Sequence, residues 1–257
     1  MRFLSFLLLA FFASCNSNTP VPPAPVAPPA DNTLSEAEKA EGWKLLFDGK
    51  SLAGWHKYGG APVGKMWTID SNAIYLAAVQ QAGHWQSSDG GDILTDSDFE
   101  NFELRLDWKI DTCGNSGIIY HITEDTTKYD YPWKTGPEMQ VLDNSCHPDG
   151  KIEKHRASDL YDLVKSTTEP VKPALQWNSI RLVSDHGHVE HWINGVKVVD
   201  IQMMKDGKPT EEWLKLIAGS KFPKQPAPDF GLSTKGKISL QDHGNRVWYK
   251  NIKIKSL

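Results

Sequence analysis

The chain has 257 residues, of which 39% are hydrophobic, 10% aromatic and 23% charged. This length allows one large β domain or two small ones, and the hydrophobic content is ample for a core. The formal net charge is −4 and the pI is near 6.1. The chain has no excess of basic residues, which argues against nucleic acid as a partner.

The N-terminus predicts an export signal. Arg2 supplies a short positive region, and the apolar run from Phe3 to Phe12 is too short to span a bilayer. Small residues then precede Cys15, as in a bacterial lipobox, whose cysteine is lipidated and becomes the mature N-terminus. The alternative is an ordinary cleaved signal with an incidental cysteine. We therefore expect residues 1–15 to be a lipoprotein signal peptide, and Cys15 to anchor the protein in the bacterial cell envelope, facing the periplasm or the cell surface.

A linker is expected over residues 16–40. Its first half is rich in proline, which makes it an extended, semi-rigid spacer between the membrane and the domain. A short helical turn follows over Ser35–Ala40, with Ser35 placed to cap it and Gly42 to end it. Residues 41–257 show no repeat and no second change of composition, so we treat them as one domain.

That domain consists mainly of short segments with strand-like alternation, separated by Gly, Asn, Ser and Asp clusters. Residues Gly42–Leu52 are expected to form a first strand and a tight turn at Asp48-Gly49. Further strands are expected at Trp67–Asp70, Ala73–Ala77, Asp92–Thr95, Phe99–Ile110, Gly117–His121, Trp177–Val183, Val189–Ile193, Val196–Ile201, Ile238–Gln241 and Val247–Ile254. Asn194-Gly195 predicts a tight hairpin, and Thr210 caps a helix that runs to about Ala218. Many short strands with minor helices predict an all-β fold, a jelly-roll sandwich of two antiparallel sheets.

One further strand, within residues 136–144, carries polar groups that a purely structural strand does not need. Glu138 and Gln140 share one face, and Asp143 joins them if the strand bulges near Leu142. Three convergent polar groups on a concave sheet suit sugar recognition and acid–base chemistry. The alternative is an ordinary solvated strand face. The ten Trp of the chain offer platforms for sugar rings, although most Trp in any domain are core residues.

Motifs for cofactors are absent from the sequence. It contains no glycine-rich phosphate loop, no paired cysteine clusters and no His-Glu-x-x-His helix. A divalent metal ion held by Glu138, Asp143 and histidines stays open as an alternative. Cys113 and Cys146 either form a disulfide in an oxidising compartment or are free buried thiols, because pairing cannot be deduced from sequence.

Several stretches in order resemble one family. They are Gly42-Trp43 with Leu46-Phe47-Asp48-Gly49, Asn115-Ser116-Gly117, Gly136-x-Glu138-x-Gln140-Val141-Leu142-Asp143, Leu160-Tyr161-Asp162, Trp177-Asn178, His191-Trp192-x-Asn194-Gly195, and Leu240-Gln241-Asp242-His243-Gly244 followed by Asn251-Ile252. From about Leu34 to the C-terminus the chain resembles the 3-keto-disaccharide hydrolase family of exported bacterial proteins. The resemblance implies a concanavalin- or laminin-G-like jelly roll.

This fold is also similar to family 16 glycoside hydrolases, whose catalytic strand carries Glu, Asp and Glu at the positions of Glu138, Gln140 and Asp143. The amide in the middle and the shorter final acid depart from the two-carboxylate retaining mechanism. The resemblance instead implies cleavage of sugars already oxidised to a ketone at C3, by elimination or hydrolysis. A separate oxidoreductase is then expected to make the ketone. A carbohydrate-binding module without catalysis and a conventional glycosidase remain alternatives.

The expected site residues fall into two groups. Glu138, His191 and Asp143 are the candidates for catalysis, with core packing as the alternative for His191 and turn stabilisation as the alternative for Asp143. Candidates for substrate binding are Gln140, Asn115, Ser116, His121, Tyr161 and His243. The alternatives are bracing of the final turn for His243, which is slightly favoured, anchoring of the loop for Tyr161, and a turn at the start of the strand for Asn115 and Ser116. At His121 the family usually shows Arg, which weakens the transfer of an anion- or carbonyl-binding role to this position.

Overall fold

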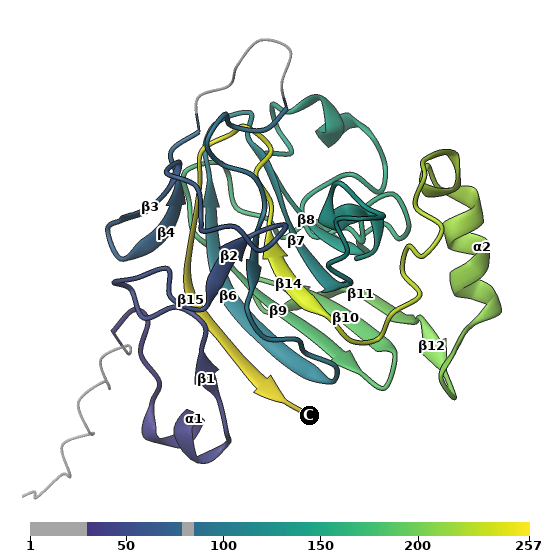
Figure 1. Cartoon of the computed structure of the whole chain (residues 1–257), viewed down its shortest axis with the longest axis horizontal. Coiled ribbons are helices and arrows are strands. Elements are labelled where there is room, and N and C mark those ends of the chain that lie inside the picture. Colours follow the sequence, from purple (N-terminus) through teal and green to yellow (C-terminus); the bar gives the residue numbers. More distant parts are fainter. Residues whose placement is uncertain (1–29, 79–84) are drawn as a thin grey trace, which may run out of the picture.

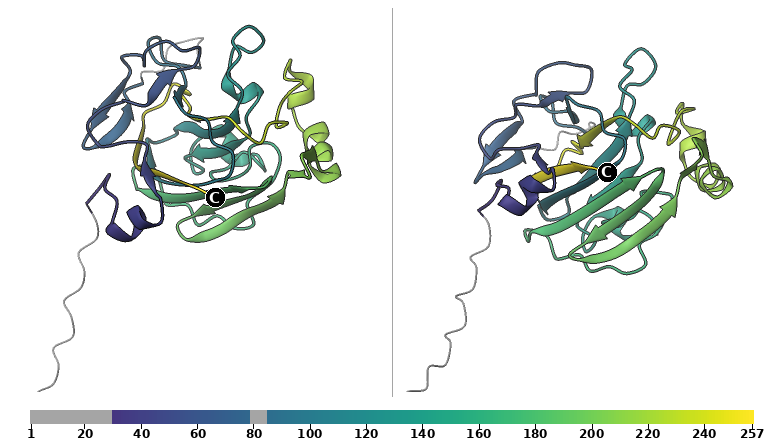
Figure 2. Two further views of the ribbon diagram at one scale, coloured as in Figure 1. Left: turned by 60° about the horizontal axis from the view of Figure 1, so that its bottom comes forward. Right: turned by 90° about the horizontal axis from the view of Figure 1, so that it is seen from below.

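The computed structural model describes residues 30–78 and 85–257. The predicted signal peptide, the lipidation site Cys15 and most of the linker lie outside the described residues. In the described part, two large antiparallel sheets lie one over the other, and the helices are few and short (Figure 1, Figure 2). The predicted all-β sandwich of two antiparallel sheets with minor helices is confirmed. No helix in the described ranges is long and apolar enough to cross a membrane.

The larger sheet has eight strands. Its order is β11-β10-β9-β6-β15-β4-β3, and β1 pairs with β15. The bounds are β1 Lys44–Leu45, β3 Trp67–Asp70, β4 Ala73–Leu76, β6 Phe102–Ile110, β9 Asn178–Asp185, β10 His188–Ile193, β11 Val196–Gln202 and β15 Val247–Ser256. The chain turns at the predicted Asp48-Gly49, where the Asp48 carboxylate accepts backbone hydrogen bonds from Lys50 and Ser51 (both 2.8 Å), and the strand before this turn is shorter than expected.

The smaller sheet has five strands in the order β2-β5-β14-β7-β8. The bounds are β2 Trp55–Lys57, β5 Ile93–Thr95, β7 Asn115–Ile122, β8 Glu138–Leu142 and β14 Lys237–Leu240. A separate hairpin pairs β12 (Met204–Lys205) with β13 (Lys208–Pro209). The order places β7 and β8, which carry most of the predicted polar site residues, side by side at one edge of the sheet.

The main core fills the space between the two sheets. On β6 the alternation works as predicted, since Leu104, Leu106 and Trp108 are at most 2% exposed and belong to the core cluster. From the smaller sheet, Ile118 and Met139 point into the same cluster. Because side chains alternate along a strand, the neighbours of these residues point away from the core, onto the outer face of the smaller sheet.

That outer face is apolar at one end and polar at the other. Leu94, Ile119 and Ile122 form a small second cluster there, and Trp133 packs against it. The polar end is covered only by loops and short helical turns. These are η1 (Pro132–Lys134), η2 (Pro148–Lys151) and η3 (Phe222–Lys224). The polar end of the smaller sheet is therefore the place where a cavity can form.

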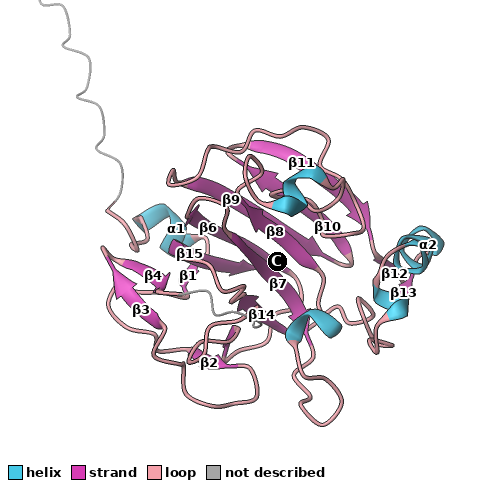
Figure 3. Cartoon of the chain, turned by 90° about the horizontal axis from the view of Figure 1, so that it is seen from above, coloured by secondary structure: helices cyan, strands magenta, loops and turns pink. Residues whose placement is uncertain are grey.

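Two α-helices lie at the periphery. Helix α1 (Glu36–Ala40) has the predicted Ser35 cap, which forms a reciprocal capping box with Glu38. Helix α2 (Glu211–Gly219) begins at the predicted cap Thr210 and lies beside the β12–β13 hairpin (Figure 3). The chain then turns directly from α2 into η3, which brings the segment after the helix back towards the outer face of the smaller sheet.

Candidate active site

A cavity of about 210 Å³ opens on the polar end of this outer face. Its floor comes from strands β7 and β8 and from the end of β14, and its walls come from five loops. The lining residues are Trp85, Asn115, Tyr131, Trp133, Glu138, Gln140, Tyr161, Lys221, Phe222, Gln225, Gln241 and His243.

Glu138 is the one carboxylate among these lining residues, and it lies on the cavity floor. Its residue is only 7% exposed, and burial raises the pKa of its carboxyl to about 8. The positive charge of Lys221 opposes this rise and the negative charge of Asp149 adds to it. Glu138 therefore holds its proton at neutral pH and can donate it to a substrate.

A cation and a phenol lie close to this carboxyl. Lys221 Nζ donates to the hydroxyl of Tyr161 at 3.0 Å and lies 4.2 Å from the centroid of the Tyr161 ring. The backbone N–H of Tyr161 donates to the carbonyl of Glu138 at 2.9 Å, which fixes the loop to β8. Burial raises the pKa of Tyr161 above its usual 10, so the phenol stays a hydrogen-bond donor. Together the two side chains can stabilise a developing oxyanion.

Asp162 holds this cation in place. One of its oxygens accepts from the backbone N–H of Lys221 at 2.6 Å, and the other lies 3.0 Å from His155 Nε2. The His155 ring in turn packs on Tyr161 at 4.3 Å between ring centroids. The segment after α2 and the loop after β8 are thus joined at the cavity mouth.

A row of aromatic rings gives the cavity a largely apolar side. The ring of Trp85 lies 4.9 Å from that of Tyr131 and 5.5 Å from that of His243, and Tyr131 stacks with Trp133 at 6.0 Å, all between centroids. Aromatic rings with a polar edge fit ligands that are apolar on one face and hydroxylated at the rim, as sugars are.

Two buried amides on the floor lack partners for their carbonyl oxygens within the described residues. They are Asn115 Oδ1 and Gln241 Oε1, on residues 3% and 5% exposed. A buried acceptor without a donor costs free energy, and a ligand hydroxyl can supply the missing hydrogen bond. Both side chains therefore fit a role in binding a polyhydroxylated molecule.

His243 has the protonation state opposite to that of Glu138. Desolvation lowers its pKa below the usual 6.5 of histidine, and the neighbouring His147 lowers it further. The two imidazole rings lie edge to face, with centroids 6.3 Å apart. His243 is therefore a neutral imidazole at pH 7, which can accept a proton.

Five of the predicted site residues line this cavity, namely Glu138, Gln140, Asn115, Tyr161 and His243. The other four do not. Ser116 lies on the inner face of β7, where its Oγ donates to the carbonyl of Gln241 (2.6 Å) and contacts the hydroxyl of Tyr249 (2.7 Å). We therefore correct the expected substrate-binding role of Ser116, because the alternation of the strand points it into the core.

Two of the three predicted histidines, His191 and His121, are also core residues. His191 is fully buried, and its ring lies 3.2 Å from the Tyr120 hydroxyl and 3.1 Å from the Ser158 carbonyl. His121 adopts a left-handed φ of 56°, and its Nε2 lies 3.0 Å from Ser184 Oγ. Burial lowers the pKa of each to about 4. The expected catalytic role of His191 and binding role of His121 are corrected, since neither lines the cavity.

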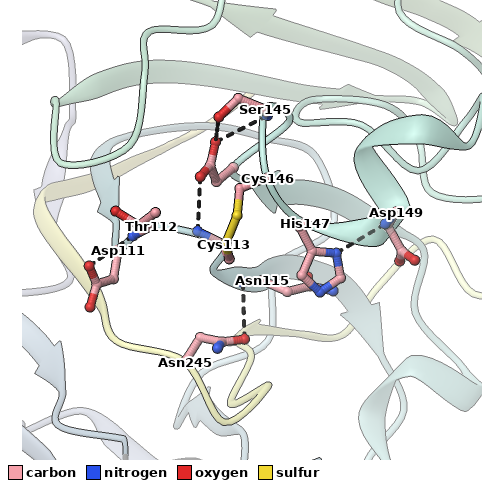
Figure 4. The surroundings of a disulfide bond; sticks show 10 residues. Asp111, Thr112, Cys113, Asn115, Ser145, Cys146, His147, Asp149 and Asn245 are labelled. Atoms are coloured by element: carbon pink, nitrogen blue, oxygen red, sulfur yellow. Dashed lines mark hydrogen bonds between the residues drawn. A yellow bond between two sulfur atoms is a disulfide. The ribbon is translucent and has the colours of Figure 1, made fainter.

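Asp143 stabilises a turn, which was the alternative for it. Its carboxylate accepts from the backbone N–H of Cys113 at 2.9 Å and from the hydroxyl of Ser145 at 2.6 Å. It does not line the cavity with Glu138, so the expected catalytic role is corrected here as well. Cys113 and Cys146 form a disulfide that joins the residues just before β7 and just after β8 (Figure 4).

The metal site considered for Glu138 and Asp143 is not formed by these residues. Among the described residues, the group of three whose ligand atoms lie within 4.8 Å of one another is His188, Glu190 and Asp200, far along the chain on β10 and β11. Lys197 Nζ already contacts Glu190 (3.1 Å) and Asp200, which places an ammonium group where a metal ion would be.

Sequence reasoning missed several lining residues. They are Trp85, Tyr131, Trp133, Lys221, Phe222, Gln225 and Gln241. Gln241 had a signal, because it follows the last core residue of a strand and precedes a turn. Lys221 and Trp85 had none, since only the fold brings their loops over β8.

A jelly roll whose sheet face carries a buried acid, a cation and an aromatic row defines a carbohydrate-active enzyme. The matching family is described as a 3-keto-alpha-glucoside-1,2-lyase-like domain, and its model spans residues 42–255. The chain belongs to this family, and it is a glycoside hydrolase or lyase. It is 34% identical over 236 residues to a 3-keto-disaccharide hydrolase of Bacteroides thetaiotaomicron, with 85% of this chain and 79% of that protein covered.

Several solved structures are similar to this fold. The structure of a candidate glycosyl hydrolase from Parabacteroides distasonis is 36% identical, with a TM-score of 0.76 and coverage of 89% of this chain and all (100%) of that one. A second candidate glycosyl hydrolase from the same organism is 27% identical, with a TM-score of 0.60 and coverage of 84% and 99%. A Bacillus subtilis protein with a galectin-like fold is similar in fold alone, at 14% identity, a TM-score of 0.50 and coverage of 79% and 89%.

Proposed function

We propose that the enzyme cleaves glycosides whose glycosyl ring carries a ketone at C3, by acid–base chemistry centred on Glu138. The observation that carries this proposal is the buried carboxyl of Glu138, whose pKa burial raises, in a cavity that also holds the Lys221–Tyr161 pair. The name of the Bacteroides relative and the description of the family support the same substrate class.

The ketone makes cleavage possible without an oxocarbenium-like transition state. It acidifies the hydrogen on C2, so a base removes this proton and leaves an enolate across C2 and C3. When the enolate re-forms the C3 carbonyl, a double bond forms between C1 and C2. The glycosidic C1–O bond breaks in the same step, and the leaving oxygen takes a proton. Addition of water to the C1=C2 bond completes a net hydrolysis, and omission of this step leaves an elimination. One site can therefore serve both outcomes.

Two residues with opposite protonation states suit the two proton transfers. In an α-glucoside the C2–H and C1–O bonds point to opposite faces of the ring, so a single group cannot reach both. His243, which is neutral, takes the C2 proton, and Glu138, which is protonated, gives one to the leaving oxygen. Lys221 and Tyr161 stabilise the negative charge on the C3 oxygen.

The enzyme needs no redox cofactor for this reaction, since the ketone arrives on the substrate. The proposal therefore includes a separate oxidoreductase that oxidises C3 of the parent glycoside. It also retains the lipid anchor at Cys15, which rests on residues 1–15 of the sequence. Detergent phase partitioning of the wild type and Cys15→Ser tests the anchor. Partition of both proteins into the aqueous phase would refute it.

The test of the activity compares 4-nitrophenyl 3-keto-α-glucoside with its unoxidised parent. We expect the wild type to release nitrophenol from the keto form alone, and Glu138→Gln to lower kcat/KM by about 10²–10⁴-fold, the usual contribution of a positioned proton-transfer group. His186→Gln is a matched control, because His186 is 81% exposed in its side chain and lies on the β9–β10 turn.

Two other results would reject the proposal. Equal cleavage of the unoxidised parent would indicate a conventional glycosidase. No cleavage of either compound, together with sugar binding that survives Glu138→Gln, would indicate a binding module.

A further inference from the structure

A second cavity, of about 310 Å³, lies beside the first. Its lining residues are Trp85, Cys113, His147, Pro148, His243 and Asn245. Trp85 and His243 line both cavities, so the two spaces meet along these two side chains. A hydrogen bond also connects the two cavities (Figure 4). The backbone N–H of Asn115, on the floor of the first cavity, donates to Oδ1 of Asn245, in the second cavity, at 3.2 Å.

The first cavity, which contains the acid, is too small by itself for a whole glycoside with two rings. Small-molecule sites are usually about 300–1,000 Å³, and the first cavity, at about 210 Å³, falls below this range. The second cavity, at about 310 Å³, is at its lower limit, and the two volumes together fall within it. A glycoside has two parts joined at one oxygen, and the two cavities likewise have one shared boundary.

The chemistry of the two cavities divides them. The first contains the acid, the cation and both unpaired buried amide oxygens, which are the groups that the reacting ring requires. The described residues that line the second cavity include no carboxylate and no ammonium group. It offers an indole face from Trp85, an imidazole from His147, an amide from Asn245 and the apolar surface of Pro148 and the disulfide.

The exposure of the second cavity is also different. Glu138, Asn115 and Gln241 in the first are buried, whereas His147 and Asn245 are half-buried and Pro148 is exposed. The ring that reacts, which we call the inner ring, fits beside the buried acid and amides of the first cavity, and the second ring of a glycoside fits the second cavity.

We propose that the second cavity is the leaving-group subsite and binds a six-membered ring, a pyranose or the aryl ring of a phenol, attached through oxygen to C1 of the reacting sugar. The proposal rests on the proposed function for its assignment of the inner ring. Trp85 packs on the face of the second ring, and His147 and Asn245 contact its rim. His243, at the boundary, lies next to the bond that breaks.

The experiment uses three substrates that share the inner ring. Methyl 3-keto-α-glucoside lacks a second ring, 3-keto-maltose adds a pyranose, and 4-nitrophenyl 3-keto-α-glucoside adds a phenol. His147→Asn removes the imidazole but keeps a side-chain acceptor for the backbone N–H of Asp149, which His147 Nδ1 accepts at 3.2 Å. His186→Asn is the matched control on an exposed turn.

We expect His147→Asn to lower the ratio of kcat/KM for a two-ring substrate to kcat/KM for the methyl substrate by at least tenfold, with no change of this ratio in His186→Asn. A fall for 3-keto-maltose alone assigns a pyranose, and a fall for the nitrophenyl compound alone assigns a phenol. An unchanged ratio for both compounds overturns the subsite.

A binding measurement separates this outcome from failure of the proposed function. Calorimetry with unoxidised maltose and methyl α-glucoside requires no cleavage. Tighter binding of maltose that is lost in His147→Asn supports the subsite even if no keto-glycoside is cleaved. Equal affinities of the wild type for the two sugars overturn it.

Discussion

A Cβ atom at Gly117 would lie 2.0 Å from Oε1 of Glu138, so the absence of a side chain on β7 leaves the space that the acid on β8 occupies. Gly117 pairs with Gln140 in the register of the two strands, and Glu138 reaches diagonally across it. The glycine of the Asn115-Ser116-Gly117 stretch is thereby explained by a contact within the site and not by a turn, since its φ is not positive.

We expect Gly117→Ala to displace the Glu138 carboxyl and to lower kcat/KM by at least tenfold, because a small misplacement of a catalytic group is costly. Gly219→Ala is the matched control, since no atom lies within 4 Å of a Cβ there. Activity of both variants on the 3-keto substrate, with melting temperatures to verify folding, checks this prediction. Wild-type activity of Gly117→Ala would show that the position of the carboxyl is not critical.

The pH dependence of kcat/KM should have two limbs. Glu138 must be protonated to act as the acid, so activity is lost as the pH rises through about 8. His243 must be neutral to act as the base, so on the acidic side activity is lost only below pH 6.5, because its pKa is lowered. In Lys221→Met the alkaline limb should shift to higher pH, since the cation holds the pKa of Glu138 down. An alkaline limb that persists in Glu138→Gln would assign it to another group.

The same carboxyl makes stability depend on pH. Its pKa is about 8 in the folded protein against 4.5 in the unfolded chain, so the native state binds more protons between these values. This contribution to stability is fully present below pH 4.5 and is lost as the pH rises through about 8. The melting temperature of Glu138→Gln relative to wild type should therefore increase steadily from pH 5 to pH 9. A constant difference across this range would mean that Glu138 is ionised at neutral pH.

The sandwich fold could be predicted well from the sequence, because the patterns that indicate it involve residues close together in the chain. Alternation on β6 and the Asn194-Gly195 hairpin depend only on neighbouring residues, and both are present in the structure. The site was predicted only in part, since alternation says which residues share a face but not which face is concave. His191 was misplaced for that reason. Ser116 was misplaced because β7 begins at Asn115 and not at the predicted Gly117, so the adjacent Asn115 and Ser116 lie on opposite faces of the strand.

The prediction for His121 was wrong for a different reason. A left-handed residue within β7 (φ 56°) reverses the expected face at that point, and the register between β7 and β14 shifts nearby. The loops that complete the cavity come from residues far apart in the chain. Lys221, for example, reaches the site because Asp162 binds its backbone, a contact between residues with no common sequence pattern.

A substitution of His191 tests directly whether this residue belongs to the core. His191→Gln should lower the free energy of unfolding by about 1–3 kcal/mol, because the Tyr120 hydroxyl and the Ser158 carbonyl lose a well-placed partner. We expect kcat/KM to change less than twofold at temperatures where the variant is folded. Urea denaturation beside the exposed control His186→Gln measures the first effect. A hundredfold loss of activity with unchanged stability would return His191 to the catalytic residues.

The Cys113–Cys146 disulfide should contribute to stability through the unfolded state. It closes a loop with a sequence separation of 33, for which loop-closure entropy gives about 3–4 kcal/mol. The double variant Cys113→Ser/Cys146→Ser should lose this amount in urea denaturation. A reductant should destabilise the wild type to the same extent and leave the variant unchanged.

Because the bridge joins the start of β7 to the segment of His147, its loss should also raise KM for two-ring substrates more than for the methyl glycoside. Titration of two reactive thiols in the native wild type would show that the bridge is not formed in solution.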